Sequence, residues 1–337
     1  MGFDKTKPVL GIMLGDATGI GPELVSKLAS KDFYKDYCRP VIIGDARIFQ
    51  CGLNTFGGKV PYYTVDTVEQ IDWDKDEYPI LDLKNQDPAK ITVGKADVYC
   101  GIGTMAMLKC GCDLCKQGKI EGFCFAPFNK IALKQGGCHF ESEHYYMADY
   151  FGVTVPFGEI NMLGDLMTVR TTSHVPIKQV SDMLTVDRIY RAIELGYSAA
   201  KSTGKENPRI SVAALNPHCG ENGLCGTEEI DRIKPAIEKA RANGWDVTGP
   251  YSSDILFIRA FKGEFDAVVT MYHDQGQIAL KLKGFDYGIT VAGGQPYPIA
   301  TCAHGTAYEI AGKGIANTSA FENAVKMASK MALAKRK

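Results

Sequence analysis

The stretch PVLGIMLGDATGIGPE, residues 8–23, contains the unit from which we predict the fold of this chain. Residues 8–14 form a continuous apolar run, which is typical of a strand buried on both faces of a sheet. The glycines that follow permit a tight turn, while Pro22 and Glu23 suit the first turn of a helix. The stretch therefore indicates a strand, an elbow and a helix, and it lacks the GxGxxG pattern of a dinucleotide-binding elbow.

Apolar runs of strand length alternate with helix-length segments along the 337 residues. Strands are expected at 8–14, 40–44, 60–65, 123–127, 167–170, 209–215 and 267–271, and helices at 23–30, 95–117, 142–151, 186–201, 227–242, 252–262 and 319–335. This alternation predicts an α/β fold with a mostly parallel sheet. We expect two lobes, the first made of residues 1–130 plus 284–337 and the second of residues 131–283.

The composition excludes several classes of function. Lysine and arginine total 38 against 39 acidic residues, so the chain lacks the excess of basic charge typical of nucleic-acid binding. No apolar run approaches the roughly 20 residues that span a bilayer. Eleven dispersed cysteines without an export signal favour reduced thiols and a cytoplasmic location. The group Cys110, Cys112 and Cys115 lies in an expected helix, so we interpret it as core in preference to a metal site.

Three histidines follow expected strands directly or after a short spacer. They are His174 in TTSHVP, His218 in LNPHCGE and His273 in MYHDQG. Ligands of open α/β sheets lie beyond the carboxyl ends of strands, and imidazole is the commonest side-chain ligand of transition metals. We therefore predict a shared metal site, with Asp274 orienting an imidazole or joining the ligands. Lys281 could clamp an anionic substrate, although a solvated surface lysine is the simpler interpretation.

The string HGTAYEIAGKGIAN, residues 304–317, is the most specific motif in the chain. Its glycines and small residues would let the backbone approach a flat ligand. It resembles the adenine-binding loop of the isocitrate and isopropylmalate dehydrogenase superfamily. Together with GDxxGIGPE, NPH, GTEE and YHDQG, it makes the whole chain similar to the 4-hydroxythreonine-4-phosphate dehydrogenase family.

This resemblance implies a homodimer of two-lobed subunits, with a mostly parallel central sheet and an active site in the interdomain cleft at the dimer interface. The first lobe would be the cofactor side, and the second would carry the metal, the substrate and the dimer contacts. A divalent metal, with zinc favoured over magnesium, manganese or cobalt, would be held by His174, His218 and His273 from both subunits. NAD or NADP would bind near Gly294, His304, Gly305, Thr306 and Asn317. The implied reaction oxidises a secondary alcohol beside a carboxylate, with Lys281 and Asp274 as catalytic residues and decarboxylation following.

The expected substrate positions depart from the family pattern. A His-Thr pair of the family falls on Glu143 and His144, an asparagine on Thr290 and an arginine on Ile299. Losing the arginine removes a planar phosphate clamp, so we expect a hydroxy acid bound in an altered phosphate pocket by Glu143, His144, Lys281 and Thr290. Enzymes that oxidise cis-dihydrodiol carboxylates such as that from terephthalate are an alternative precedent. A non-catalytic metabolite-binding protein and a metallohydrolase remain alternatives from other classes.

Overall fold

The computed structural model describes residues 2–336, which divide into two compact units. The first unit runs to Val153 and resumes at Gln295, and the second spans Thr154–Gly294. The sequence placed these boundaries earlier, at residues 130/131 and 283/284. The first boundary lies later because helices α5 (Lys130–Gln135) and α6 (Glu143–Phe151) pack on α4 (Val98–Lys116) of the first unit. The second lies later because residues 289–293 pair with residues 158–162 of the second unit.

Within the first unit, the described residues form a six-stranded sheet in the order β3-β4-β2-β1-β5-β12, with every pair of neighbours parallel. Its strands are β1 (Val9–Met13), β2 (Arg39–Gly44), β3 (Tyr62–Val65), β4 (Tyr78–Asp82), β5 (Gly122–Phe125) and β12 (Ile299–Cys302). The central strands are buried along nearly their whole length, as continuous apolar runs require.

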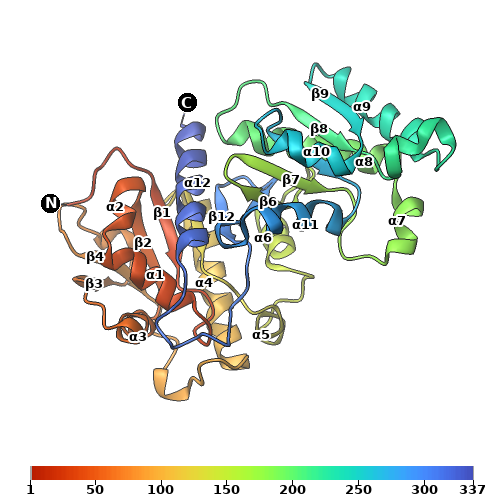
Figure 1. The fold of residues 1–337 in the computed structure, drawn as a ribbon. Helices are drawn as coiled ribbons and strands as arrows, with labels where there is room; N and C mark the ends of the chain where they lie inside the picture. The colour runs from red at the N-terminus through yellow and green to blue at the C-terminus, as the bar shows by residue number, and fades with distance from the viewer. Residues whose placement is uncertain (1, 337) are drawn as a thin grey trace. The chain divides into compact units, whose positions relative to one another are not determined.

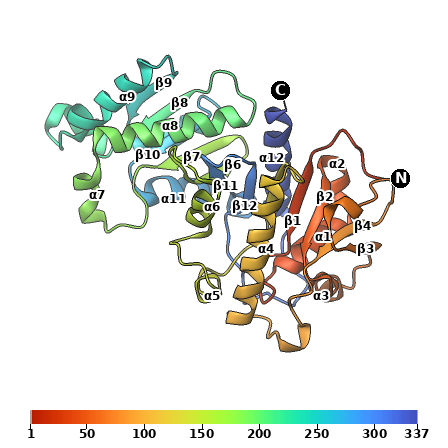
Figure 2. The same ribbon diagram turned by 180° about the vertical axis from the view of Figure 1, so that it is seen from behind.

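Helices cover both faces of this sheet (Figures 1 and 2). Helix α4 packs on β1, β2 and β5, while α12 (Ser319–Lys335) packs on β5 and β12 and α2 (Phe33–Tyr37) packs on β2. Helix α1 (Gly21–Ser30) follows β1 through the glycine elbow and packs on α3 (Ala46–Phe56). The strand–elbow–helix unit predicted from residues 8–23 is thereby confirmed.

The strands of the second unit follow the order β11-β6-β7-β10-β8-β9. Strand β6 is antiparallel to β11 and β7, and the remaining pairs are parallel. The strands are β6 (Gly158–Leu163), β7 (Leu166–Arg170), β8 (Ile210–Ala213), β9 (Val247–Tyr251), β10 (Ala267–Thr270) and β11 (Ile289–Gly293). The helices are α7 (Ile177–Met183), α8 (Val186–Ser202), α9 (Lys234–Arg241), α10 (Ser253–Ala260) and α11 (His273–Gly284), with α8 nearest the viewer in Figure 2 and α10 and α11 in Figure 1.

The predicted α/β fold with a mostly parallel sheet is confirmed. The helix expected over 227–242 is present, as a π-helical turn at Glu229–Ile233 that continues directly into α9. Pro235 lies in the first turn of α9, where it has no N–H to donate to the preceding turn. His273 is the first residue of α11.

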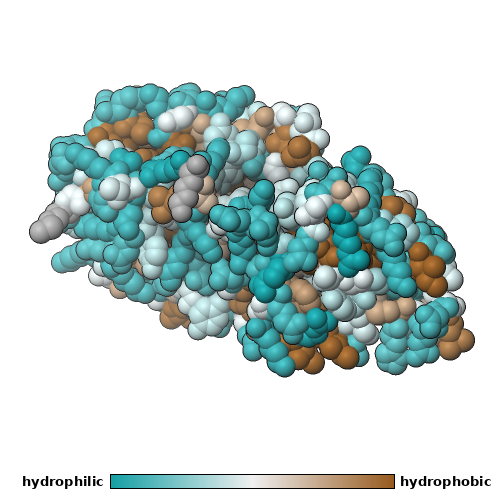
Figure 3. All heavy atoms as spheres, turned by 90° about the horizontal axis from the view of Figure 1, so that it is seen from above, coloured by the Kyte–Doolittle hydropathy of each residue, from teal (hydrophilic) through white to brown (hydrophobic). Residues whose placement is uncertain are grey.

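Three of the cysteines on α4 are buried, namely Cys100, Cys112 and Cys115. Burial raises the pKa of the Cys112 thiol to about 12, which disfavours the thiolate form that binds metals. The core interpretation therefore holds for Cys112 and Cys115, whereas Cys110 is half-buried. No helix within residues 2–336 is both long and apolar enough to cross a membrane. The face drawn in Figure 3 is mainly hydrophilic, with smaller groups of hydrophobic residues.

Candidate metal and cofactor sites

The neighbouring parallel strands β7 and β10 bring two of the predicted metal ligands together in the second unit. The pairing continues past the strand ends, because the backbone N–H of Thr172 donates to the carbonyl of Met271 at 3.1 Å, and its hydroxyl donates to the same oxygen at 2.7 Å. His174 follows this clamp, and His273 begins α11. Their ring centroids are 5.7 Å apart with planes tilted by 40°.

This pair fits a divalent metal. Two imidazoles on a tetrahedral zinc, at Zn–N distances of about 2.0–2.1 Å, have ring centroids roughly 5 Å apart. The carboxylate of Asp274 lies 2.7 Å from Nδ1 of His273, which leaves Nε2 of that ring for a metal. His174 is exposed and the His273 side chain is 37% exposed, so both rings are accessible to an ion.

His218 lies on a different strand exit, in the turn Pro217–Gly223 after β8. Within the described residues of one chain, His174, His218 and His273 do not form a metal-ligand group, because their ring nitrogens do not all lie within 4.8 Å of one another. One chain therefore does not gather all three predicted ligands. The side chain of His218 is 70% exposed, and its Nδ1 lies 2.9 Å from Oε1 of Glu221.

The turn that carries His218 has an unusual backbone. His218, Cys219, Glu221 and Asn222 all have positive φ, between 44° and 58°, with Gly220 at 78° between them. A left-handed conformation costs a non-glycine residue about 1–2 kcal/mol, and it normally occurs in single residues. Strain of this kind persists where the surrounding structure enforces it, and it is concentrated at functional sites.

A buried carboxylate anchors the entrance of this turn. Oε1 of Glu229, a residue only 1% exposed, accepts hydrogen bonds from the backbone N–H groups of Leu215 and Asn216, both at 2.8 Å. The side-chain amide of Asn216 donates to Glu228 at 2.7 Å and to Glu229 at 3.0 Å. Both acids belong to the motif GTEE, residues 226–229, and no role was predicted for either of them.

The residues predicted to contact substrate in the second unit lie on α11 and β11. Lys281 is exposed, with its ammonium 6.0 Å from the centroid of the Phe285 ring. Thr290 is buried, and its hydroxyl accepts a hydrogen bond of 3.1 Å from the Asn161 amide. Asn161 in turn accepts a hydrogen bond from Gln277 of α11. This chain of side chains ties α11 to β6 and β11.

The predicted cofactor loop of the first unit is anchored at both ends to the glycine elbow and α1. Near its start, the N–H of Ile20 donates to the carbonyl of Thr306 at 3.1 Å. The Tyr308 hydroxyl donates to buried Asp16 at 2.7 Å. Gly19 is required for this approach, because a Cβ there would lie 2.9 Å from both Cβ and the carbonyl oxygen of Thr306.

The end of the same loop is held by a buried ion pair on α1. Lys27 lies 2.6 Å from the carboxylate of Glu23 and donates to the carbonyls of Gly314 and Ala316 at 2.9 and 3.0 Å. Glu23 accepts from the N–H of Ala316 at 2.8 Å. A pocket of about 80 Å³ adjoins this contact, lined by residues that include Pro22, Glu23, Ile48, Gly52, Val93 and Gly312.

The individual residues predicted to bind the cofactor occupy different environments. His304 is half-buried and Gly305 exposed, with Nδ1 of His304 3.0 Å from the carbonyl oxygen of Gly305. Asn317 accepts from the N–H and hydroxyl of Ser319, at 3.0 and 2.8 Å, at the start of α12. Gly294 belongs to the second unit, where a Cβ would lie 2.2 Å from the carbonyl oxygen of Pro156.

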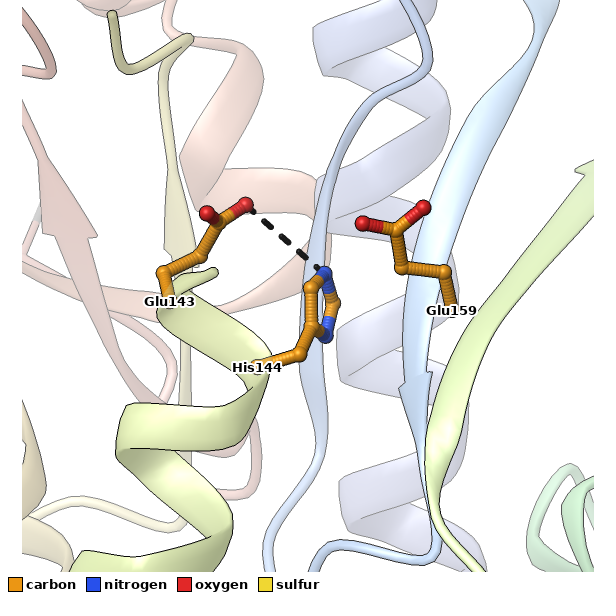
Figure 4. A group of neighbouring side chains, drawn as sticks. All are labelled: Glu143, His144 and Glu159. Carbon is orange, nitrogen blue, oxygen red and sulfur yellow. Dashed lines mark ion pairs between the residues drawn. The ribbon is translucent and has the colours of Figure 1, made fainter. Parts of the chain in front are cut away.

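Glu143 and His144 begin α6 in the first unit, and both are buried. Figure 4 shows the carboxylate of Glu143 directed toward the His144 ring, with Oε1 3.8 Å from Nε2. Glu159, also drawn there, belongs to the second unit and lies 3.1 Å from the Arg170 guanidinium. Ile299, on β12, is fully buried, so its side chain is part of the core.

Comparison with known proteins agrees with the resemblance inferred from the motifs. The family model described as pyridoxal phosphate biosynthetic protein PdxA matches residues 36–328. A 4-hydroxythreonine-4-phosphate dehydrogenase of Desulforapulum autotrophicum is 36% identical, with 96% of this chain and 95% of that protein covered. A D-threonate 4-phosphate dehydrogenase of Cupriavidus necator is 35% identical, with coverages of 96% and 97%.

A solved structure extends this agreement to the fold. The crystal structure of a 4-hydroxythreonine-4-phosphate dehydrogenase from Burkholderia phymatum has a TM-score of 0.82 and 34% identity to this chain. The alignment covers 96% of this chain and 98% of that one. The chain belongs to the PdxA family, whose named relatives are dehydrogenases that act on a CH–OH group.

Proposed function

We propose that the chain is a divalent-metal-dependent, NAD(P)-linked dehydrogenase that oxidises a hydroxy carboxylic acid. The observation that carries this proposal is the pair His174 and His273, at the exits of two adjacent parallel strands and at a ring separation that fits one metal. A metal bound there would polarise the substrate hydroxyl, lower its pKa and favour hydride transfer to the nicotinamide.

The residues of this chain would divide the remaining tasks. His273 would bind the metal through Nε2, because Asp274 occupies its Nδ1. Lys281 is on the same helix, eight residues further on, and its ammonium would attract the substrate carboxylate as a point charge. The loop 304–317 would receive the dinucleotide, since its anchored backbone exposes Gly305 while Thr306 stays buried. Gly294 completes the proposed cofactor set.

We propose that decarboxylation follows oxidation. Oxidising a hydroxyl group at the β-position of a carboxylate gives a 3-keto acid, and loss of CO₂ from such an acid leaves an enolate that the bound cation would stabilise. The chain would then release NAD(P)H and CO₂ in equal amounts. Zinc is our favoured metal because three imidazoles form a common zinc ligand set.

The identity of the acid is the finer part of the proposal. The relatives named above act on phosphorylated acids, as their names state. At the corresponding positions this chain has Glu143, which adds a negative charge, and Ile299, which is fully buried and cannot bind a phosphate. We therefore propose an acid that places no phosphate against Glu143, and cis-dihydrodiol carboxylates belong to the substrate classes to be tested.

We also propose that the second unit forms a homodimer interface that delivers His218 to the metal of the partner copy. Within the described residues of one chain, His218 does not form a ligand group with His174 and His273. Large apolar side chains of α10 and α11 and of the residue after α11 are more than half exposed, namely Ile255, Ile258, Ile278, Leu282 and Phe285. Exposed apolar surface of this kind marks protein interfaces.

The test is NAD and NADP reduction with a panel of phosphorylated and unphosphorylated hydroxy acids, before and after metal removal. We expect turnover that is lost with a chelator and restored by zinc, manganese or cobalt, and that is lost in His273→Ala. The exposed His139→Ala is the matched control, because His139 lies outside all proposed sites. Metabolite binding without NAD(P)H formation would instead support a sensor, and hydrolysis without dinucleotide binding a metallohydrolase.

A further inference from the structure

A second carboxylate–imidazole contact repeats the arrangement found at His273. Oε1 of Glu221 lies 2.9 Å from Nδ1 of His218, as Oδ1 of Asp274 lies 2.7 Å from Nδ1 of His273. In both pairs the carboxylate contacts Nδ1 of the imidazole ring. A neutral imidazole that donates its Nδ1 proton to a carboxylate presents the lone pair of Nε2.

The backbone of the turn creates the contact at His218. Residues 218–222 all have positive φ, and this left-handed run places Glu221 beside the ring three positions earlier. Buried Glu229 holds the entrance of the turn through the N–H groups of Leu215 and Asn216. The Sγ of Cys219 donates to the carbonyl of Pro250 at 3.6 Å, which ties the turn to β9. These contacts hold the strained backbone in place, and the backbone in turn holds the exposed imidazole of His218 beside Glu221.

We infer that Glu221 is a positioning residue, which fixes the Nδ1–H tautomer of His218 so that Nε2 is the atom offered to the metal. Asp274 does the same for His273. This inference rests on the proposed metal-dependent function, and it adds the ligating atom and the residue that selects it. Carboxylates that orient ligating histidines commonly change metal affinity by 10–100-fold when removed.

The principal variant is Glu221→Asn. Asparagine tolerates the left-handed backbone, and its shorter side chain withdraws the acceptor from Nδ1. Glu221→Gln is the rescue variant, because it keeps an oxygen acceptor at the same reach. Glu264→Gln is the matched control, since Glu264 is a similarly exposed carboxylate of the second unit that pairs with Arg259.

The measurements are zinc affinity, by competition with a chelator, and the tautomer of His218 in metal-free protein, from two-dimensional ¹H–¹⁵N spectra of the imidazoles. We expect Glu221→Asn to lose zinc affinity by about 10–100-fold and to lose the Nδ1–H signature. Glu221→Gln should recover most of both, and Glu264→Gln should change neither. If Glu221→Asn does not fold, Asp274→Ala removes the acceptor from Nδ1 of His273 at a side chain that is 71% exposed, and it provides the same test there, with Asp274→Asn as the rescue variant.

Two results separate failure of this inference from failure of the proposed function. If His218→Ala lowers zinc affinity while Glu221→Asn keeps both the affinity and the tautomer, the positioning role of Glu221 is wrong. If His174→Ala, His218→Ala and His273→Ala all leave zinc affinity unchanged, the proposed metal site is wrong.

Discussion

Replacing Lys27 with methionine tests how the predicted cofactor loop is held. The Lys27 and Glu23 side chains are 16% and 2% exposed, and the ammonium also binds two loop carbonyls. Methionine keeps most of the apolar stem but leaves the carboxylate with the single N–H of Ala316. Breaking a buried ion pair on one side costs about 3–5 kcal/mol. We expect a loss of about 3 kcal/mol in the free energy of unfolding.

Thermal and urea denaturation measure this loss. For a unit of this size, 1 kcal/mol corresponds to about 2–4 °C in Tm, so the expected fall is roughly 6–12 °C. Lys109→Met is the control, because Lys109 and Asp113 form an i,i+4 pair with side chains 59% and 36% exposed. That pair should contribute only about 0.3–0.5 kcal/mol.

A double variant measures how much of this loss comes from the unpaired negative charge of Glu23. Glu23→Gln removes the anion but keeps an acceptor for the Ala316 N–H, so Glu23→Gln with Lys27→Met should recover much of the stability lost in Lys27→Met. Equal losses in Lys27→Met and Lys109→Met would refute the reasoning, and so would a double variant less stable than Lys27→Met alone.

Three further predictions concern other parts of the chain. Burial opposes ionisation of Asp266, but hydrogen bonds from Arg209 and Lys205 lower its pKa to about 2. The ionised carboxylate should therefore stabilise the folded state by about 2 kcal/mol above pH 4, and this contribution should be lost as the pH falls through 2. Asp266→Asn should abolish this part of an acid-unfolding curve. Thiol titration of the native protein should modify exposed Cys51 and Cys225 first, and rapid modification of buried cysteines would contradict the described core. Gly19→Ala should cost about 1–3 kcal/mol by urea denaturation, because its Cβ would press on Thr306, and an unchanged midpoint would show that the loop yields freely.

Much of the first unit could be predicted from sequence because its buried strands are continuous apolar runs. The strands at 8–14 and 123–127 and the helix at 319–335 are present with small changes in their ends. Strands β4, β6, β9, β11 and β12 were not predicted, since polar residues or proline interrupt their apolar runs, such as Glu159 in β6, Thr290 in β11 and Pro250 in β9. Their pairing depends on neighbours far away in sequence, which a local pattern does not contain.

The candidate site shows the same division. The strand exits predicted that His174 and His273 would lie close together, because parallel neighbouring strands end at the same edge of a sheet. The left-handed turn around Glu221 could not be predicted, since four of its five successive left-handed residues, 218–222, are not glycine and adopt a conformation that L-residues avoid. Glu229, which holds this turn, is one of two adjacent acids that the sequence does not distinguish.

The proposed metal site at His174 and His273 is tested most directly by an anomalous difference map at the zinc edge, from crystals of the protein in its solution assembly. We expect one strong peak per chain, about 2.0–2.1 Å from Nε2 of His273 and from a ring nitrogen of His174, with His218 of a second copy as the third ligand. A map from crystals grown with saturating zinc that shows no peak at His174 and His273 would contradict the proposed metal site.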